Sequence, residues 1–290
     1  MSEMIQLLHD LNAINKDGLE IFYPRVRDRD DIKVLRDKLT EVIVLSRSDH
    51  INPEYYKNRE EKEGHTVHKL ELKTPRLHDN IRRSEDFGNY IKNKRWLDFG
   101  CGLGGMLNEI GFEAYSAVGL EPNKTRLKYS KQKGFKIFER IDQIKDNSLD
   151  VITLFHVLEH LLDPVKTLKL LKKKLDKNGI IIIEVPHARD ALFTLFDCEK
   201  FKQFSFWSEH LVLHTKMSLK LILNASLFTN IKIQGYQRYS LSNHLYWLSK
   251  GEPGGHEKWS MIASKELDDA YYEKLESINR TDTLIAIAEK

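Results

Sequence analysis

The sequence predicts an α/β fold in which helices cover both faces of a mostly parallel sheet. From Trp96 onward, short apolar runs alternate with segments of helical periodicity, which is typical of this fold class. A glycine-rich turn follows the first apolar run, at Gly100, and an acid ends the second, at Glu121. Ligands of such sheets bind beyond the carboxyl ends of the strands, so these residues mark the expected site.

Residues 1–75 are expected to form a small α+β segment ahead of the main domain, residues 76–290. The clearest element of the segment is a strand over 41–45, flanked by charged stretches. The main domain begins with a helix over 76–91, where Arg82 and Arg83 face either a carboxylate or solvent.

The remaining elements follow from hydrophobic periodicity. Asn178-Gly179 is expected to stop one helix, and Thr215 is expected to cap the start of another. Strands are predicted over 96–99, 117–121, 135–139, 149–155, 180–185, 230–239 and 283–288, and helices from about residue 104, over 123–133, 164–175 and 216–227.

Composition narrows the class of protein. The 290 residues carry 46 basic and 43 acidic side chains, so the chain lacks the concentrated basic field of a dedicated nucleic-acid binder. Two cysteines, Cys101 and Cys198, are too few for a disulfide framework or a cysteine zinc site. No signal peptide is recognisable, and the longest aliphatic run, 180–183, is too short to span a bilayer. We therefore expect a soluble, cytoplasmic protein.

The turn after the first strand is suited to binding a cofactor. Its glycines also fit the G-x-G-x-x-G pattern of dinucleotide-binding proteins, so the glycines alone do not identify the cofactor. Asp98, two residues before Gly100, would repel a pyrophosphate but could accept hydrogen bonds from a cationic or hydroxyl-bearing ligand. Glu121, at the end of the next strand, is placed to receive two ribose hydroxyls. The pair suits S-adenosylmethionine, which carries an amino group, a sulfonium and a ribose but no phosphate.

The stretch from Asp98 to Gly104 resembles motif I of class I S-adenosylmethionine-dependent methyltransferases, D-x-G-x-G-x-G, and Glu121 resembles their ribose-binding acid. The resemblance covers about residue 76 to the C-terminus. It implies a Rossmann-like sheet of seven strands closed by an antiparallel pair, with S-adenosylmethionine as methyl donor and S-adenosylhomocysteine as product. It assigns cofactor binding to Asp98, Gly100, Cys101, Gly102, Gly104, Glu121, Pro122, Ile141, Phe155 and His156.

Within that family the chain resembles the sugar and cell-surface polysaccharide methyltransferases. Relatives among the sugar methyltransferases often carry a cysteine-rich zinc module at the N-terminus, and this chain has no cysteine before Cys101. In similar enzymes aromatic residues upstream of motif I can cover cofactor or substrate, which makes Tyr55 and Tyr56 candidates, although rings that anchor a surface segment are the simpler explanation. Residues 240–282 would be an insertion between the last two strands that serves either substrate specificity or a homodimer contact.

The segment from His156 to His160 has the H-x-x-E-H spacing of inverted zinc peptidases. A zinc site needs a third ligand, and the sequence marks none. The segment directly follows the fourth strand, where similar methyltransferases carry H-V-L-E-H beside the methionine part of the cofactor. We therefore expect no metal here.

Residues 206–211 resemble the Y-x-E-H-L segment of deoxysugar C-methyltransferases, with Trp207 in place of the tyrosine. His210 matches the histidine near the transferred methyl group, and imidazole can accept a hydroxyl proton near neutrality. A histidine satisfied by a neighbouring carboxylate is the structural alternative. His156 and His187 are alternative bases, and the resemblance assigns Trp207 and Glu209 to the acceptor.

The resemblance to the sugar methyltransferases, including the E-H-L segment, implies methyl transfer to a small polar acceptor. It favours O-methylation of a nucleotide-sugar or another capsule or surface-polysaccharide precursor over C- or N-methylation. An NAD-dependent oxidoreductase and a non-catalytic S-adenosylmethionine-binding scaffold are the alternatives from other classes. An RNA methyltransferase is disfavoured because no basic tract is interleaved with stacking aromatics.

Overall fold

The computed structural model describes residues 2–52, 54–58 and 74–290. Two sheets organise this part of the chain: one of seven strands in the order β10-β11-β8-β7-β4-β5-β6, and one of four in the order β1-β2-β3-β9. The large sheet confirms the predicted fold class, because its strands are parallel except β11, which runs antiparallel to both β8 and β10.

The strands of the large sheet form where the sequence is most continuously apolar. Ile181, Ile182 and Ile183 are fully buried in β8, as expected for an interior parallel strand. The bounds are β4 Arg95–Phe99, β5 Ser116–Leu120, β6 Ile137–Phe138, β7 Leu149–Phe155, β8 Leu175–Pro186, β10 Thr229–Tyr236 and β11 Thr283–Glu289.

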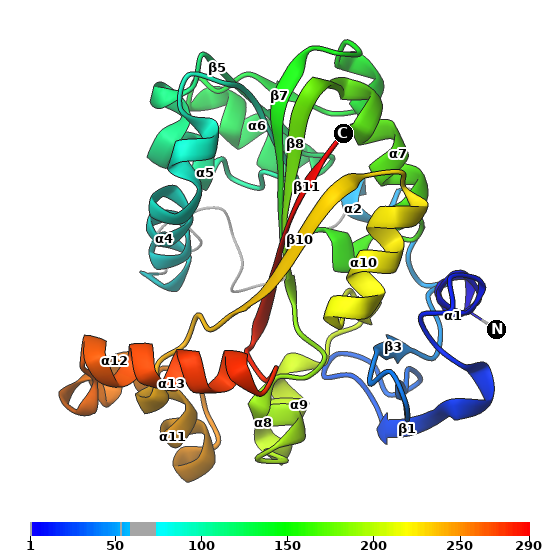
Figure 1. The fold of residues 1–290 in the computed structure, drawn as a ribbon, viewed down its shortest axis with the longest axis vertical. Coiled ribbons are helices and arrows are strands. Elements are labelled where there is room, and N and C mark those ends of the chain that lie inside the picture. Colours follow the sequence, from blue (N-terminus) through cyan, green and yellow to red (C-terminus); the bar gives the residue numbers. More distant parts are fainter. Residues whose placement is uncertain (1, 53, 59–73) are drawn as a thin grey trace.

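Helices cover both faces of this sheet, with α4, α5 and α6 on one side and α7 and α10 on the other (Figure 1). Their starts follow ordinary capping chemistry, because the Asp163 carboxylate accepts the Lys166 N–H and the Thr215 hydroxyl accepts the Ser218 N–H. The bounds are α4 Thr74–Ile91, α5 Gly105–Ile110, α6 Lys124–Gln132, α7 Pro164–Lys174 and α10 Lys216–Ala225.

One predicted boundary is wrong. Asn178-Gly179 does not stop a helix, because α7 has already ended at Lys174 and β8 begins at Leu175. Leu175 pairs with Leu149 of β7, and an irregularity in the pairing follows before Val151 meets Ile180. Asn178-Gly179 lies within this irregular part of β8, where no pairing with β7 is formed.

The N-terminal residues form α1 Glu3–Asp10 and the strands β1 Leu19–Tyr23, β2 Val34–Asp37 and β3 Ile43–Leu45. The fourth strand of their sheet, β9 Val212–Leu213, comes from the main domain and pairs with β3. The small sheet therefore holds the chain next to His210. The boundary predicted between residues 75 and 76 stays a prediction, and residues 59–73 lie outside the described ranges.

Residues 240–282 form helices at the carboxyl end of the large sheet (Figure 1). They are α11 Leu241–Lys250, α12 Gly255–Lys258 and α13 Lys265–Ser277. Gly254 is the N-cap of α12. Short helices α2 Tyr55–Asn58, α8 Ala191–Thr194 and α9 Glu199–Ser205 complete this end of the molecule. Within the described ranges, no helix combines the length and apolar character needed to cross a membrane.

Candidate cofactor and acceptor site

A cavity of about 1000 Å³ lies where β4, β5, β7 and β8 end. Gly100, Glu121, His156 and Pro186 line it from these strand ends. The insertion contributes another wall, and the N-terminal segment adds Arg27 and Tyr56. This volume is at the upper end for small-molecule sites, which leaves room for a cofactor together with an acceptor. The wall residues from the insertion are Asn243, His244, Trp247, Pro253, Gly254, His256 and Glu257.

The glycine turn between β4 and α5 requires glycine for two reasons. Gly100, Gly102 and Gly104 have φ angles of 77°, 57° and 78°, in the left-handed region that side chains disfavour. A Cβ at Gly100 would also lie 2.5 Å from Cγ2 of Val157, and one at Gly104 would lie 2.8 Å from the Phe135 ring. The turn can therefore follow this path only because these positions lack side chains.

Glu121 ties the end of β5 to the glycine turn. One carboxylate oxygen accepts the Gly102 N–H at 2.9 Å, and the other accepts the Asn123 N–H at 2.8 Å. The side chain is buried but borders the cavity, as does the neighbouring Pro122. The structure thus presents a fixed carboxylate at the place where the sequence predicts a ribose-binding acid.

Asp98 lies at the end of β4, beneath the turn. Its carboxylate accepts the Thr153 hydroxyl at 2.9 Å, and that hydroxyl in turn accepts the indole N–H of Trp96. Burial raises the pKa of Asp98 to about 6, even though the Thr153 hydrogen bond and the Arg83 charge favour the ionised form. The carboxyl group is therefore held in one orientation by the sheet itself.

Three predicted cofactor residues have their side chains in the protein core. Cys101 packs on Gly119, and burial raises the pKa of its thiol. Phe155 stacks on Phe87 with ring centroids 5.4 Å apart. Ile141 begins a 3-10 turn and packs against the main hydrophobic cluster. Any contact that Cys101 makes with a ligand would have to come from its backbone.

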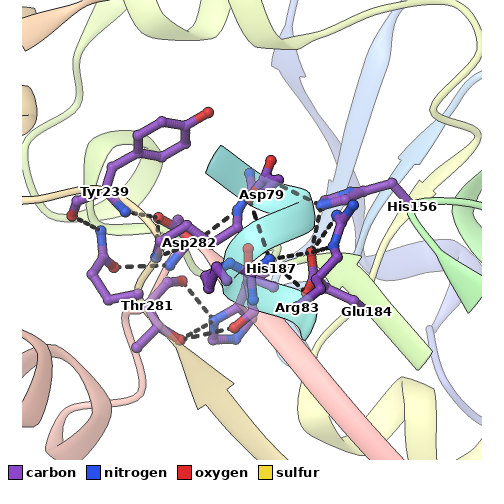
Figure 2. Close-up of polar contacts among 12 residues, drawn as sticks. Asp79, Arg83, His156, Glu184, His187, Tyr239, Thr281 and Asp282 are labelled. Atoms are coloured by element: carbon purple, nitrogen blue, oxygen red, sulfur yellow. Dashed lines mark hydrogen bonds and ion pairs between the residues drawn. The ribbon is translucent and has the colours of Figure 1, made fainter. Parts of the chain in front are cut away.

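A network of buried charges lies beside the cavity, centred on Glu184 of β8 (Figure 2). Arg82 and Arg83 of α4 donate to its carboxylate at 2.8 and 2.6 Å, so the carboxylate alternative for these arginines is confirmed. Burial opposes ionisation of Glu184, but Arg83, His156 and Arg82 hold its pKa well below the usual range. The network joins helix α4 to the central sheet through charge-assisted hydrogen bonds.

His156 connects this network to the cavity. Its φ of 54° is uncommon for a residue with a side chain, and its ring lies between Glu159, 3.2 Å from Nδ1, and Glu184, 3.2 Å from Nε2. Burial and Arg238 disfavour a charged ring, but the hydrogen bonds to Glu159 and Glu184 outweigh them and raise the pKa of His156. The Arg238 guanidinium lies 3.0 Å from Nε2.

Next to His156, across Glu159, a second histidine cluster faces the cavity. The rings of His160 and His210 both line it, with centroids 4.9 Å apart, and Trp207 lies 5.7 Å from His210. Burial, together with the neighbouring His160, lowers the pKa of His210 to about 3. The ring is therefore a neutral imidazole at physiological pH, with a lone pair available.

Aromatic residues from the N-terminal segment lie against this cluster. The Tyr55 hydroxyl donates to Glu209 at 3.0 Å, and the Tyr56 ring stands edge-on to His160 and borders the cavity. Glu209 is buried but also borders the cavity. Tyr55, Tyr56, Trp207 and Glu209, which are far apart in sequence, therefore meet around one pair of histidines.

His187 does not face the cavity, which corrects the expectation that it points toward the active-site face. It is fully buried next to His214, and its Nδ1 lies 2.9 Å from the Thr281 carbonyl oxygen (Figure 2). Burial lowers its pKa to about 3. The chain reverses here between the two sheets, and this enclosure removes His187 from the candidate bases.

Buried neutral histidines predict loss of stability in mild acid. Burial lowers the pKa of His187 to about 3 and the pKa values of His214 and His244 to about 4. Below about pH 6.5 the unfolded chain binds these protons and the native state does not, so each residue costs up to about 1.4 kcal/mol per pH unit. The lowered pKa of His210, about 3, adds a fourth residue of the same sense, whereas the raised pKa values of His156, Asp98 and Asp190 act in the opposite sense and reduce the fall.

We expect the midpoint of urea unfolding to fall between pH 7.5 and pH 5. The variant His214→Gln, which cannot become charged, should show a smaller fall. Equal midpoints at the two pH values would contradict the assignment of these histidines as buried and neutral.

The sequence analysis did not identify several residues of the cavity wall. Arg238 follows β10, and Asp282 precedes β11 and accepts the Arg238 N–H at 3.0 Å. Asp190 caps α8 by accepting the Leu192 N–H, and burial together with Asp282 raises its pKa to about 8. A charged residue directly beside a predicted strand end was the available signal for Arg238 and Asp282.

The comparisons with known proteins agree with this geometry. A family model described as a methyltransferase domain matches residues 67–233. No curated protein matches the chain. A SAM-dependent methyltransferase from Archaeoglobus fulgidus has a similar structure, with 24% identity and a TM-score of 0.56, over 77% of this chain and all of that one.

A second similar structure is a SAM-dependent methyltransferase of Thermotoga maritima, described as a possible histamine N-methyltransferase. It is 15% identical with a TM-score of 0.52, over 78% of this chain and 96% of that one. These likenesses concern the fold, whereas the family model spans more than half of the chain and resolves the ambiguity of the glycine turn. The cofactor is S-adenosylmethionine, and the chain belongs to the methyltransferase-domain family of class I S-adenosylmethionine-dependent enzymes.

Proposed function

We propose that the protein transfers a methyl group from S-adenosylmethionine to a hydroxyl of a small polar acceptor, with a nucleotide-linked sugar or another surface-polysaccharide precursor as the favoured substrate class. One observation carries the proposal. The same cavity extends from the strand ends at Gly100 and Glu121 to the aromatic and histidine cluster around Trp207 and His210. Donor and acceptor can therefore occupy adjoining parts of one enclosed space.

The cofactor would lie at the strand ends. The Glu121 carboxylate accepts the Gly102 and Asn123 N–H groups and also borders the cavity, where carboxylate oxygens can accept ribose hydroxyls. Gly100 borders the same cavity, so a cofactor there can approach its main chain. His156, between the turn and Arg238, would border the methionine part, and Asp98 would act from beneath the turn.

The acceptor would lie against the aromatic end. Trp207, Phe204 and Tyr239 offer ring faces on which a sugar can stack. Arg27 and Arg126 also line the cavity and add positive charge, which suits the phosphates of a nucleotide-linked sugar. The neighbouring histidines favour a hydroxyl acceptor over an amine, because an oxygen nucleophile must lose its proton as it is methylated.

The reaction needs alignment more than activation. The sulfonium carbon is already electrophilic, so the protein has to place the acceptor oxygen in line with the C–S bond. As the C–O bond forms and the C–S bond breaks, the hydroxyl proton passes to the neutral ring of His210 and S-adenosylhomocysteine leaves. His156 is the second candidate for this proton, because it also borders the cavity.

Calorimetric titration with S-adenosylhomocysteine tests the cofactor half of the proposal. We expect Glu121→Ala to weaken binding at least about tenfold, because it removes acceptors that are charged. Glu257→Ala, at the insertion end of the same cavity, should bind like the wild type. Unchanged affinity in Glu121→Ala would place the cofactor elsewhere.

Methyl transfer from labelled S-adenosylmethionine to a panel of nucleotide-sugars tests the acceptor half. A product that carries the labelled methyl group on oxygen supports the proposal. A labelled methyl group on carbon or nitrogen would show that the enzyme is a C- or N-methyltransferase. Tight binding of S-adenosylhomocysteine without turnover on any acceptor would favour a non-catalytic scaffold.

A further inference from the structure

Glu159, His160 and His210 form a cluster at the cavity wall that the proposed reaction leaves unexplained. Each residue offers one donor atom, and the three atoms lie within 4.8 Å of one another. Both rings border the cavity, while the Glu159 side chain lies fully buried behind them. Nε2 of His160 is 3.9 Å from Oε1 of Glu159.

The polar atoms of this cluster are poorly satisfied by the described part of the chain. Oε1 of Glu159 contacts His156, but the buried Oε2 has no hydrogen-bond partner there, and neither has the buried Nδ1 of His160. The imidazole of His210 makes ring contacts with His160 and Trp207. Buried polar groups without partners require an explanation, and a bound ion is one.

We propose that Glu159, His160 and His210 bind a divalent first-row transition-metal ion, with Zn²⁺ as the best match. Two imidazole nitrogens and one carboxylate oxygen are a donor set that such ions prefer, whereas Mg²⁺ and Ca²⁺ prefer oxygen alone. Three protein ligands are also the pattern of catalytic zinc sites, which leave a position open. Because both histidine rings border the cavity, the vacant coordination position of the ion would face the cavity.

The donor atoms are close to the required geometry. Ligands at 2.0–2.1 Å from a tetrahedral ion stand about 3.4 Å apart, so a shift of about 1 Å in the rings would complete the site. The site differs from the one that the H-x-x-E-H spacing suggests. Residues 158–160 form a 3-10 turn, and the His156 ring lies between Glu159 and Glu184, outside the group of three donors. The third ligand that the sequence did not mark is His210, brought in beside β9.

This inference rests on the proposed function for what the ion would do. An ion at the open position would bind the acceptor hydroxyl and lower its pKa, so that the proton leaves to water before or as the oxygen attacks the methyl carbon. The C–S bond breaks as the C–O bond forms, as in the metal-free scheme. In this scheme the lone pair of His210 would bind the ion, whereas in the metal-free scheme it accepts the hydroxyl proton. Only the first scheme requires a metal.

The test is metal binding in the absence of methyl donor and acceptor. Tag-free protein treated with a chelator is titrated with Zn²⁺ by calorimetry, and the Co²⁺ form is examined for the visible absorption of a tetrahedral or five-coordinate site. We expect one equivalent to bind, and both His210→Ala and Glu159→Gln to weaken binding at least about tenfold. His256→Ala, a histidine in another wall of the same cavity, should bind like the wild type.

Binding of S-adenosylhomocysteine by each variant shows that its fold is intact. Absence of stoichiometric Zn²⁺ binding, or binding equal in wild type, His210→Ala and Glu159→Gln, would overturn the metal site. Neither result depends on turnover, so failure of the metal site and failure of the proposed methyl transfer are distinguishable. With an acceptor in hand, activity lost on metal removal and restored by Zn²⁺ would assign His210 to the ion.

Discussion

Replacement of His210 by alanine is expected to lower kcat for methyl transfer by about 10²- to 10⁴-fold, the range for loss of a proton-transfer residue. The ring lines the acceptor end of the cavity and is neutral because burial lowers its pKa to about 3. Cofactor affinity should be unchanged, since the expected cofactor contacts come from Glu121 and the glycine turn. Single-turnover assays separate the two effects.

The matched control for this variant is His256→Ala. His256 borders the same cavity from α12, yet it lies outside the cluster around Trp207. A loss of kcat in His256→Ala as large as in His210→Ala would contradict the assignment. A His210→Ala variant with unchanged kcat would move the role to His156.

Replacement of Glu184 by alanine should destabilise the fold by about 3–5 kcal/mol, the range for breaking a buried ion pair from one side. The reason is that Arg82, Arg83 and His156 would lose the carboxylate on which all three converge. The side chains of Arg82 and Arg83 are only 16% and 10% exposed, so water cannot fully replace the lost carboxylate. Urea unfolding at pH 7 measures the change.

A surface pair offers the comparison. Asp176 bonds Arg95 at 2.7 Å with both side chains partly exposed, so Asp176→Ala should cost no more than about 1 kcal/mol. Similar losses in the two variants would show that the Glu184 network contributes no more than a surface ion pair. A network that matters should also weaken below about pH 4.5, because a carboxylate with a lowered pKa loses its stabilising effect as it is protonated.

The strand pattern and the glycine turn were predictable because they depend on local sequence. Ile181 to Ile183 can only be an interior strand, and the left-handed φ angles from Gly100 to Gly104 need glycine. The caps at Asp163 and Thr215 also follow from the identities of neighbouring residues. Such features are decided within a few residues, so tertiary structure rarely overrides them.

The arrangement of the site depended on contacts that no local pattern encodes. Asn178-Gly179 resembles a helix stop, yet it lies in an irregular stretch of β8 between the paired residues Leu175 and Ile180. His187 follows a strand as active-site residues do, but the second sheet encloses it. Arg238 reaches His156 across 82 positions, and His210 reaches His160 across 50, and only the fold reveals either contact.

The pairing of β3 with β9 bears on how such a protein can change over time. The predicted cofactor residues Gly100 and Glu121 follow strands of the large sheet, whereas the segment carrying Trp207 and His210 is anchored by a sheet to which the N-terminal residues contribute three strands. If the acceptor lies against Trp207 and His210 as proposed, substitutions in β1, β2 or β3 are expected to change acceptor preference more than they change the ends of β4 and β5.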